Sequence, residues 1–416
     1  MDDVVIASAC RSAIGAFGGA LKDVPPYLLA ATVVREAVAR AGIEPDQVDD
    51  VRLGSCFESY LTKSVARSAA IEAGIPVTAT AVSLDRVCVS AMEAVVSGMA
   101  MIKAGLVDVV VAGGVEVMSG VPYAVPTARW GARLQNQTID DQVIEGLYCG
   151  SRYHPCPPCD DAERYPVHAR LAGHPYVMGD TAELVAEKYG LTREELDEVA
   201  LRSHHNVERA TEEGDFAAEV VPVEIPQKRG RPPLVFARDE HFRPGLTMED
   251  LAALRPAFAP GSGVVTAGNS SGINDGASAV VIMSAAKARE LGVTPLAVIR
   301  GVGYGGCEPS LMGLSPVPAV HDLERRSGLE LQDFELLEVH EAFASQYLAC
   351  ERDLGLDREI TNVNGSGIGL GHPVGSTGCR LLVTLLHAMR RRGKTLGMAT
   401  LCGGGGVSMA TAVELV

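Results

Sequence analysis

Two cysteines and two histidines stand where strand-like runs give way to turns. Cys88 ends "AVSLDRVC" and directly precedes an apolar helical pattern, whereas His340 follows the strand-like "FELLEV". His372 lies in the glycine-rich "VNGSGIGLGHPVGSTG", and Cys402 is followed at once by Gly403–Gly406. A thiol at a helix start has a lowered pKa, and an imidazole can take its proton. The four side chains predict a cysteine-based nucleophilic site if the fold brings them together.

The elements that must position these side chains alternate in type. The first half reads "DVVIASA", "PYLLAATVVREAVARAG", "DVRLGSC", "SVARSAAIEAGIP", "TAVSL", "VSAMEAVVSGMAMIKAG" and "DVVVAGG". Glycine and proline close several of the helical patterns. Alternating strands and helices, with near-continuous apolar runs in the strands, predict an α/β fold with a mostly parallel sheet.

The second half repeats this plan. It reads "PLAVIRGVGYGG", "VPAVHDLERRSGL", "DFELLEVHEAFA", "LLVTLLHAMRRRG" and "GMATLCGGGG", in the order of the first half's strands and helices. The region from Val121 to Pro260 is richer in proline, charge and aromatic residues, and it contains Trp130, the only tryptophan. We therefore expect two pseudo-symmetric halves with an inserted domain of loops and helices.

Composition excludes several classes of protein. The 416 residues are 47% hydrophobic and 21% charged, with a net charge of −16. Such an acidic surface repels nucleic acid and anionic membranes, so an anionic ligand requires a local basic patch. The start lacks a basic segment before its apolar run, and no stretch approaches about 18 apolar residues. Most of the ten cysteines stand singly, which predicts free thiols and a cytoplasmic protein.

Together these motifs resemble the thiolase family. The four active-site blocks are matched by "VCVSA" at Cys88, "HEAFA" at His340, "NVNGSGIGLGHPVGSTG" at His372 and "LCGGGG" at Cys402. Further matches are "CRSAIGAFGG", "VVVAGGVEVMS", "LRPAFAPGSGVVTAGNSSGINDGASA" and "SPVPA". The resemblance implies the thiolase fold, with two pseudo-symmetric βαβαβαββ halves in a five-layer αβαβα arrangement. It places the N-terminal half at 1–120 plus about 261–290, the loop domain at 121–260 and the C-terminal half at 291–416.

The resemblance also implies a reaction, the thiolytic cleavage of a 3-oxoacyl-CoA by CoA or the reverse Claisen condensation. Cys88 is then the nucleophile that carries the acyl group, and His372 activates it. Cys402 is the second acid/base at the α-carbon, and His340 helps to hold the enolate oxygen. The backbone N–H groups of Cys88 and Gly404 bind the acyl oxygen, which explains why bare backbone follows Cys402.

Binding partners follow from the same resemblance. CoA is a substrate, with no bound cofactor and no metal. Ser271 aligns with the serine that contacts the pantetheine arm, and "PQKRGRPP" supplies Lys228, Arg229 and Arg231 for the CoA phosphates and adenine. The chain is expected to form a homodimer or a dimer of dimers. A small zinc-bearing accessory subunit, as bound by some divergent thiolases, stays open.

The sequence departs from the family in several places. His340 replaces the usual asparagine of "NEAF", and Val177 replaces the histidine of "HMG". The stretch around 144–178 contains Cys156-Pro-Pro-Cys159, whose spacing suits zinc, but no second such pair follows. A proline- and tyrosine-rich lid over an unusual acyl pocket is favoured instead. It suggests a bulky, branched, dicarboxylic or aromatic substrate, with benzoylsuccinyl-CoA as one candidate.

Other condensing enzymes of the same fold are the alternative function. Ketosynthases and hydroxymethylglutaryl-CoA synthases use Cys-His-His or Cys-His-Asn/Glu sets. They have no counterpart of Cys402, so "LCGGGG" favours a thiolase.

Overall fold

The computed structural model describes residues 3–57 and 60–416, with the side chain of Arg229 outside that description. Most of its strands form one mixed sheet, in the order β13-β14-β15-β12-β1-β11-β5-β3-β4. The first half contributes β1 (Val4–Ser12), β3 (Asp50–Gly54), β4 (Thr80–Leu84), β5 (Val109–Val117) and β11 (Asn274–Ser284). The second contributes β12 (Ala297–Gly306), β13 (Leu336–Val339), β14 (Leu396–Gly403) and β15 (Val407–Leu415).

The two halves share one topology, which confirms the predicted duplication. The first half orders its strands third, second, fourth, fifth and first along the sheet. In the second half β13, β14, β15 and β12 follow the same order, and a parallel bridge from Thr361 to Leu337 stands where the third strand would lie. The halves join where β1 and β12 pair, at Val5↔Val298 and Ile6↔Ala297.

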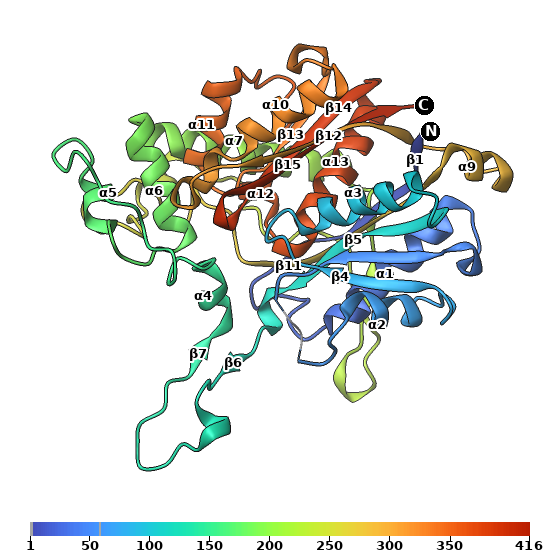
Figure 1. The fold of residues 1–416 in the computed structure, drawn as a ribbon, viewed down its shortest axis with the longest axis horizontal. Coiled ribbons are helices and arrows are strands. Elements are labelled where there is room, and N and C mark those ends of the chain that lie inside the picture. Colours follow the sequence, from blue (N-terminus) through green and yellow to red (C-terminus); the bar gives the residue numbers. More distant parts are fainter. Residues whose placement is uncertain (1–2, 58–59) are drawn as a thin grey trace.

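Helices make this sheet system five layers deep (Figure 1). On the outside of the first half lie α1 (Pro26–Ala41) and α2 (Val65–Glu72), which pack in one apolar core. Between the halves lie α3 (Ser90–Lys103) and α13 (Thr377–Arg392), which share a second core with strands of both halves. On the outside of the second half lie α10 (Pro316–Ser327) and α11 (Ala344–Leu354). The predicted fold class is confirmed.

The two central helices approach closely because glycine lies at their contact. A Cβ added at Gly378 of α13 would lie 2.6 Å from the backbone nitrogen of Met92 in α3. This contact matters for the site, because α3 begins just after Cys88 and α13 begins just after His372.

One expectation about the sheet is wrong. The strands are mixed in direction rather than mostly parallel: β3 pairs in parallel with β4 and β5, but β11 pairs antiparallel with both β5 and β1. In the second half β14 returns into β15 as an antiparallel hairpin. In each half the last strand is the antiparallel one: β15 follows β14 directly, whereas β11 follows β5 after the inserted residues 121–260.

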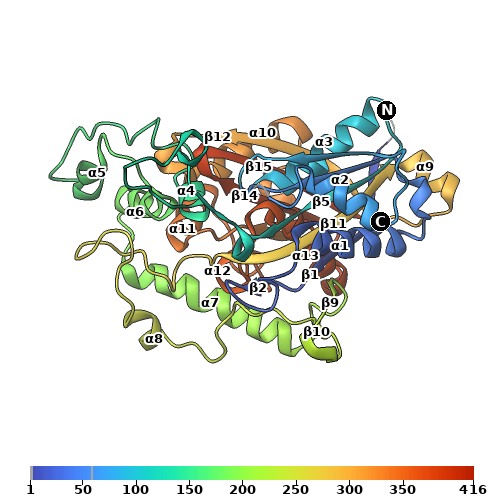
Figure 2. The same ribbon diagram turned by 90° about the horizontal axis from the view of Figure 1, so that it is seen from below.

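Residues 121–260 hold helices and short ribbons that are joined by long loops. The helices are α4 (Gln142–Leu147), α5 (Pro166–Leu171), α6 (Met178–Tyr189), α7 (Arg193–Glu212) and α8 (Met248–Ala252). The ribbons are β6 (Tyr123–Ala124) with β7 (Asp140–Asp141), and β9 (Val223–Ile225) with β10 (Leu234–Phe236). Figure 1 shows the β6–β7 ribbon on an arm that extends away from the layers, and Figure 2 shows α7 along one face.

The remaining short α-helices and strands are β2 (Gly15–Ala16), β8 (Val220–Val221), α9 (Ala285–Leu291) and α12 (Gly367–Leu370). None of the helices in the described residues has the length and apolar character that crossing a bilayer requires. All ten cysteines are free thiols, as predicted.

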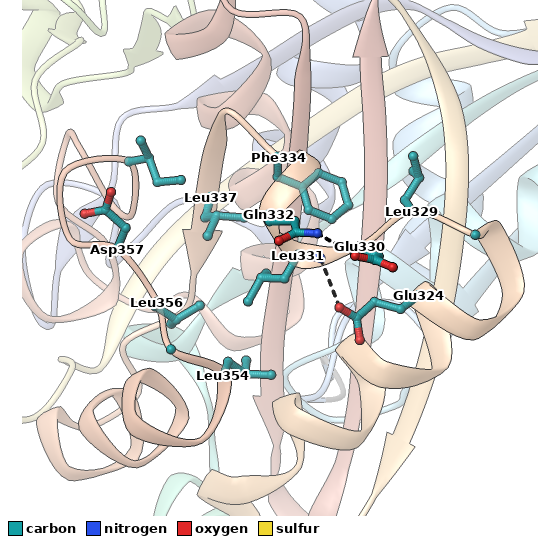
Figure 3. Close-up of a pocket in the computed structure, with 13 residues that line it drawn as sticks. Glu324, Leu329, Glu330, Leu331, Gln332, Phe334, Leu337, Leu354, Leu356 and Asp357 are labelled. Atoms are coloured by element: carbon teal, nitrogen blue, oxygen red, sulfur yellow. Dashed lines mark hydrogen bonds between the residues drawn. The ribbon is translucent and has the colours of Figure 1, made fainter.

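A surface groove of about 810 Å³ lies between the ends of α10 and α11 (Figure 3). Its lining includes Leu331, Phe334 and Leu356, and Leu337 of β13. The histidine of the "HEAFA" block follows the opposite, C-terminal end of β13. The groove is therefore separate from the candidate site.

Candidate active site

Cys88 sits on a tight turn between β4 and α3. The residue before it, Val87, has a φ of 51°, which is a strained left-handed conformation for a β-branched side chain. Local hydrogen bonds hold the turn: Asp85 Oδ1 accepts from the Val87 nitrogen at 2.8 Å, and Ser90 Oγ donates to the Val87 carbonyl at 2.6 Å. The strained turn fixes Cys88 in front of the first turn of α3.

Two backbone N–H groups point at the Cys88 sulfur. They belong to Gly404 and to Cys88 itself, and both stabilise a thiolate there. Burial outweighs them and raises the pKa of Cys88 to about 11. The prediction that the helix start lowers this pKa is therefore wrong in its net direction, because loss of solvation is the larger effect. The resting thiol is neutral and needs a base.

His372 has the tautomer that such a base requires. Thr377 Oγ1 donates its one hydrogen to the Pro373 carbonyl at 2.9 Å and lies 2.7 Å from His372 Nδ1. Nδ1 must therefore carry the hydrogen of this contact, which leaves the lone pair on Nε2. Burial, together with the charge of Arg380, lowers the pKa of His372 to about 3, so the ring is neutral.

His340 lies directly beside His372. The two ring centroids are 4.2 Å apart, and a Cβ added at Gly367 would lie 2.4 Å from His340 Cε1. The side chain of His340 is fully buried, and neither ring nitrogen has a hydrogen-bond partner within the described residues. Burial lowers the pKa of His340 well below its ordinary value, with His372 as the next cause. An orphaned, buried and neutral imidazole is free to donate to a ligand.

Cys402 completes the group from the end of β14. Its side chain is buried, and burial raises its pKa well above the ordinary value. The next largest cause of that rise is the nearby Cys88 thiol, so the two sulfurs are electrostatic neighbours. The structure thus brings Cys402 and the backbone of Gly404 to Cys88, and it pairs His372 with His340. The close contact of α13 with α3 joins the helices that follow the turns of His372 and Cys88.

Sequence reasoning missed three supporting side chains. Asn274 Oδ1 accepts from the His372 backbone nitrogen at 2.9 Å, and Thr377 holds the His372 ring. Glu116 accepts from the backbone nitrogens of Cys56 and Gly375, each at 2.9 Å, and so connects the two halves beneath the site. All three lie inside the motifs quoted above, but a motif does not reveal which atom accepts which hydrogen.

The residues expected to contact CoA lie in two different parts of the structure. The Ser271 nitrogen donates to the Ala342 carbonyl at 2.9 Å, so Ser271 lies beside the "HEAFA" block. Lys228 and Arg231 are exposed on the loop between β9 and β10, where neither side chain has a hydrogen bond or ion pair to another described residue. The side chain of Arg229 falls outside the described part of the structure.

The cysteines of the stretch around 144–178 lie in two different environments. Cys156 and Tyr176 pack with α5 and α6 in a small separate core, and Cys159 Sγ lies 3.7 Å from the Tyr165 carbonyl. No group of three or more His, Cys, Asp or Glu in the described residues is arranged to hold a metal ion. Cys149 instead reaches the site, because a Cβ added at Gly404 would lie 2.2 Å from its sulfur.

Family models cover nearly the whole chain. The model of the thiolase N-terminal domain matches residues 4–155 and 168–286, and that of the C-terminal domain matches 293–415. The chain belongs to the thiolase family. It is accordingly an acyltransferase, as the motifs predicted. The twelve residues 156–167, inside the departing stretch, separate the two matched parts of the N-terminal domain.

Named thiolases are similar to this chain over their full length. "Acetyl-CoA acetyltransferase" of Cupriavidus necator is 44% identical over 416 residues, which cover 100% of both chains. The crystal structure of the Bacillus anthracis acetyl-CoA acetyltransferase superimposes with a TM-score of 0.92 at 47% identity, covering 100% of this thiolase and 99% of that chain. Human mitochondrial 3-ketoacyl-CoA thiolase gives 0.90 at 37% identity, with the same coverage.

Proposed function

We propose that this thiolase cleaves a short 3-oxoacyl-CoA with CoA, or runs the reverse condensation, through an acyl group on Cys88. The observation that carries the proposal is the neutral thiol of Cys88, which faces two backbone N–H groups with Cys402 beside it. In this proposal the neutral imidazoles of His372 and His340, which lie side by side, supply a base and a hydrogen-bond donor.

In the cleavage direction His372 Nε2 takes the proton from Cys88 Sγ, and the sulfur attacks the C3 carbonyl of the substrate. The N–H groups of Cys88 and Gly404 stabilise the resulting oxyanion, an effect worth about 2.7–4 kcal/mol per donor. Collapse of this adduct breaks the C2–C3 bond and leaves the acyl group on Cys88. The electron pair goes to C2 and forms the enolate of acetyl-CoA.

Cys402 then protonates C2. It enters this step as the thiol, which fits its strongly raised pKa. His340 donates to the enolate oxygen, since its nitrogens have no protein partner among the described residues. The thiol of a second CoA gives its proton to the Cys402 thiolate and attacks the thioester on Cys88, and the proton held by His372 returns to Cys88 Sγ as the shortened acyl-CoA is released. Both thiols return to their starting state.

The acyl group is small in this proposal. Supporting it, Cys149 and Met178 place their sulfurs against Gly404, next to the nucleophile. The names of the similar proteins from C. necator and B. anthracis also concern acetyl-CoA. The bulky or aromatic substrate suggested by the insertion has no such support, since Cys156 and Tyr176 pack into their own core.

Condensing enzymes of the ketosynthase or hydroxymethylglutaryl-CoA synthase type would not need a thiol at position 402. The proximity of Cys402 to Cys88 favours the thiolase reaction over theirs. This proposal does not include an accessory subunit.

CoA binding and assembly complete the proposal. In this proposal Ser271, whose backbone lies beside the "HEAFA" block, contacts the pantetheine arm. Lys228 and Arg231 offer exposed positive charge for the phosphates on an otherwise acidic chain. No resident cofactor is required by this chemistry. We infer that the protein works in the reducing cytoplasm, because its ten cysteines are free thiols.

The chain forms a homodimer or a dimer of dimers in this proposal. The terminal strand β4 and the exposed apolar side chains Trp130 and Leu134 on the arm offer contact surfaces.

The test is thiolysis of acetoacetyl-CoA in the presence of CoA, compared between wild type and Cys88→Ala. We expect turnover by the wild type and none above background by the variant. Wild-type protein that cleaves no 3-oxoacyl-CoA of any chain length, or a variant that retains full turnover, would refute the function.

A further inference from the structure

The thiol of Cys149 fills the space on the side-chain side of Gly404. A Cβ added at Gly404 would lie 2.2 Å from Cys149 Sγ and 3.2 Å from Met178 Sδ. Gly404 is also the residue whose N–H points at the Cys88 sulfur. Cys149 follows the end of α4, so a side chain of the inserted region forms one wall of the space around the nucleophile.

The backbone at Cys149 indicates that its side chain is used. Cys149 has a φ of 44°, and the next residue, Gly150, has a φ of 84°. Glycine adopts this left-handed region freely, whereas a residue with a Cβ is strained there. The Cys149 nitrogen and Sγ both donate to the Gly146 carbonyl, each at 3.2 Å, and these bonds fix the sulfur's direction. A residue with a side chain thus occupies a left-handed backbone conformation that glycine would adopt without strain.

Cys149 is not a second nucleophile. Burial raises its pKa to about 12, and the neighbouring Cys88 contributes to the rise. A neutral thiol behaves as a small apolar group, and its polarizable sulfur packs closely against other atoms. Its contribution at this point is therefore its volume.

Building on the proposed function, we propose that Cys149 is the specificity-determining residue that limits the length of the acyl group on Cys88. Its thiol closes the acyl site beside Gly404, so an acetyl group fits and a longer chain meets the sulfur. The position lies at the start of the stretch in which this chain departs from its family, so acyl-length preference is set by the inserted region rather than by the catalytic motifs.

The test is a ratio of kcat/KM values, for 3-oxohexanoyl-CoA against acetoacetyl-CoA. In Cys149→Gly we expect this ratio to rise about tenfold or more, the size of effect that one or two methylenes have in an apolar pocket. Cys149→Ala should give a smaller rise. Since glycine relaxes the backbone at this position, Cys149→Gly should melt no lower than the wild type.

Cys159→Ala is the matched control, because Cys159 is another partly buried thiol of the same insertion and contacts the Tyr165 carbonyl. It should leave the ratio unchanged. A ratio that changes less than twofold in Cys149→Gly, with acetoacetyl-CoA activity retained, overturns this inference and leaves the proposed function intact. If the wild type itself cleaves neither 3-oxohexanoyl-CoA nor acetoacetyl-CoA, the proposed function is overturned instead.

A second variant pair tests the contact itself. Gly404→Ala adds a methyl group that collides with Cys149 Sγ, so acetoacetyl-CoA turnover should fall. Adding Cys149→Gly removes the colliding sulfur and should restore turnover about fivefold or more, within the range of coupling seen for residues in contact. Strictly independent effects of the two substitutions would contradict the proposed wall.

Discussion

Replacing Thr377 by valine should remove the hydrogen bond that selects the active tautomer of His372. The hydroxyl lies 2.7 Å from His372 Nδ1 and donates to the Pro373 carbonyl at 2.9 Å. With valine, the Nδ1 hydrogen loses its acceptor in a buried place, at a cost of about 1–3 kcal/mol. The ring can avoid that cost by moving its hydrogen to Nε2, and it then cannot take the proton of Cys88.

The competent tautomer therefore becomes less populated by roughly 5- to 150-fold, the equivalent of that free energy. We expect kcat and kcat/KM to fall together by a factor in this range, because a base that acts only in the chemical step is impaired. Steady-state thiolysis of acetoacetyl-CoA measures the loss, and nitrogen NMR of the histidine ring reports the tautomer directly.

Two variants serve as controls. Thr377→Ser keeps the hydroxyl and should stay within about threefold of the wild type. Thr384→Val removes a buried hydroxyl from the same helix, where it contacts Glu219 rather than the site, and so reports any general loss of stability. A folded Thr377→Val protein with wild-type kcat would refute the tautomer argument.

Three further outcomes are expected. Cys402→Ala should stop exchange of the acetyl-CoA α-protons with solvent while Cys88 is still acylated, as isotope exchange and mass spectrometry can show; retained exchange would remove Cys402 from its role. The pKa of His372 is about 3 when folded against 6.5 ordinarily, so the unfolded state binds the extra proton between these values and acidification destabilises the fold. As the pH falls from roughly 7.5 to 5, the free energy of unfolding of His372→Asn, measured in urea, should rise by about 2 kcal/mol relative to that of the wild type. A difference between variant and wild type that does not change with pH would contradict the lowered pKa. Trp130→Glu on the exposed arm should reduce the mass of the oligomer measured by light scattering. An unchanged mass would show that the arm does not contribute to oligomerisation.

Much of the fold could be predicted because the signal is repeated. Each half carries the same succession of strands and helices, and the turns after β4 and before α13 carry Cys88 and His372 at matching places. Strand direction was harder to predict. An apolar run has the same composition in either direction, so the antiparallel pairs of β11 and β15 followed only from the connections that the fold makes.

The catalytic side chains were predictable, but their charge states were not. A helix start lowers a thiol's pKa by a local effect, while burial raises it through every surrounding element. For Cys88 the second effect prevails. The roles of Glu116 and Thr377 depend on single hydrogen bonds that a motif does not specify. Cys149 reaches Gly404 from a segment distant in sequence, so no local pattern could have paired them.

The most direct test of the account is the mass of the intact protein after acetyl-CoA alone is added and the reaction is quenched in acid. The wild type should gain the mass of one acetyl group, peptide mapping should place it on Cys88, and Cys88→Ala should gain none. Label on another residue, or a protein that turns over acetoacetyl-CoA without ever carrying an acetyl group on Cys88, would contradict the central claim.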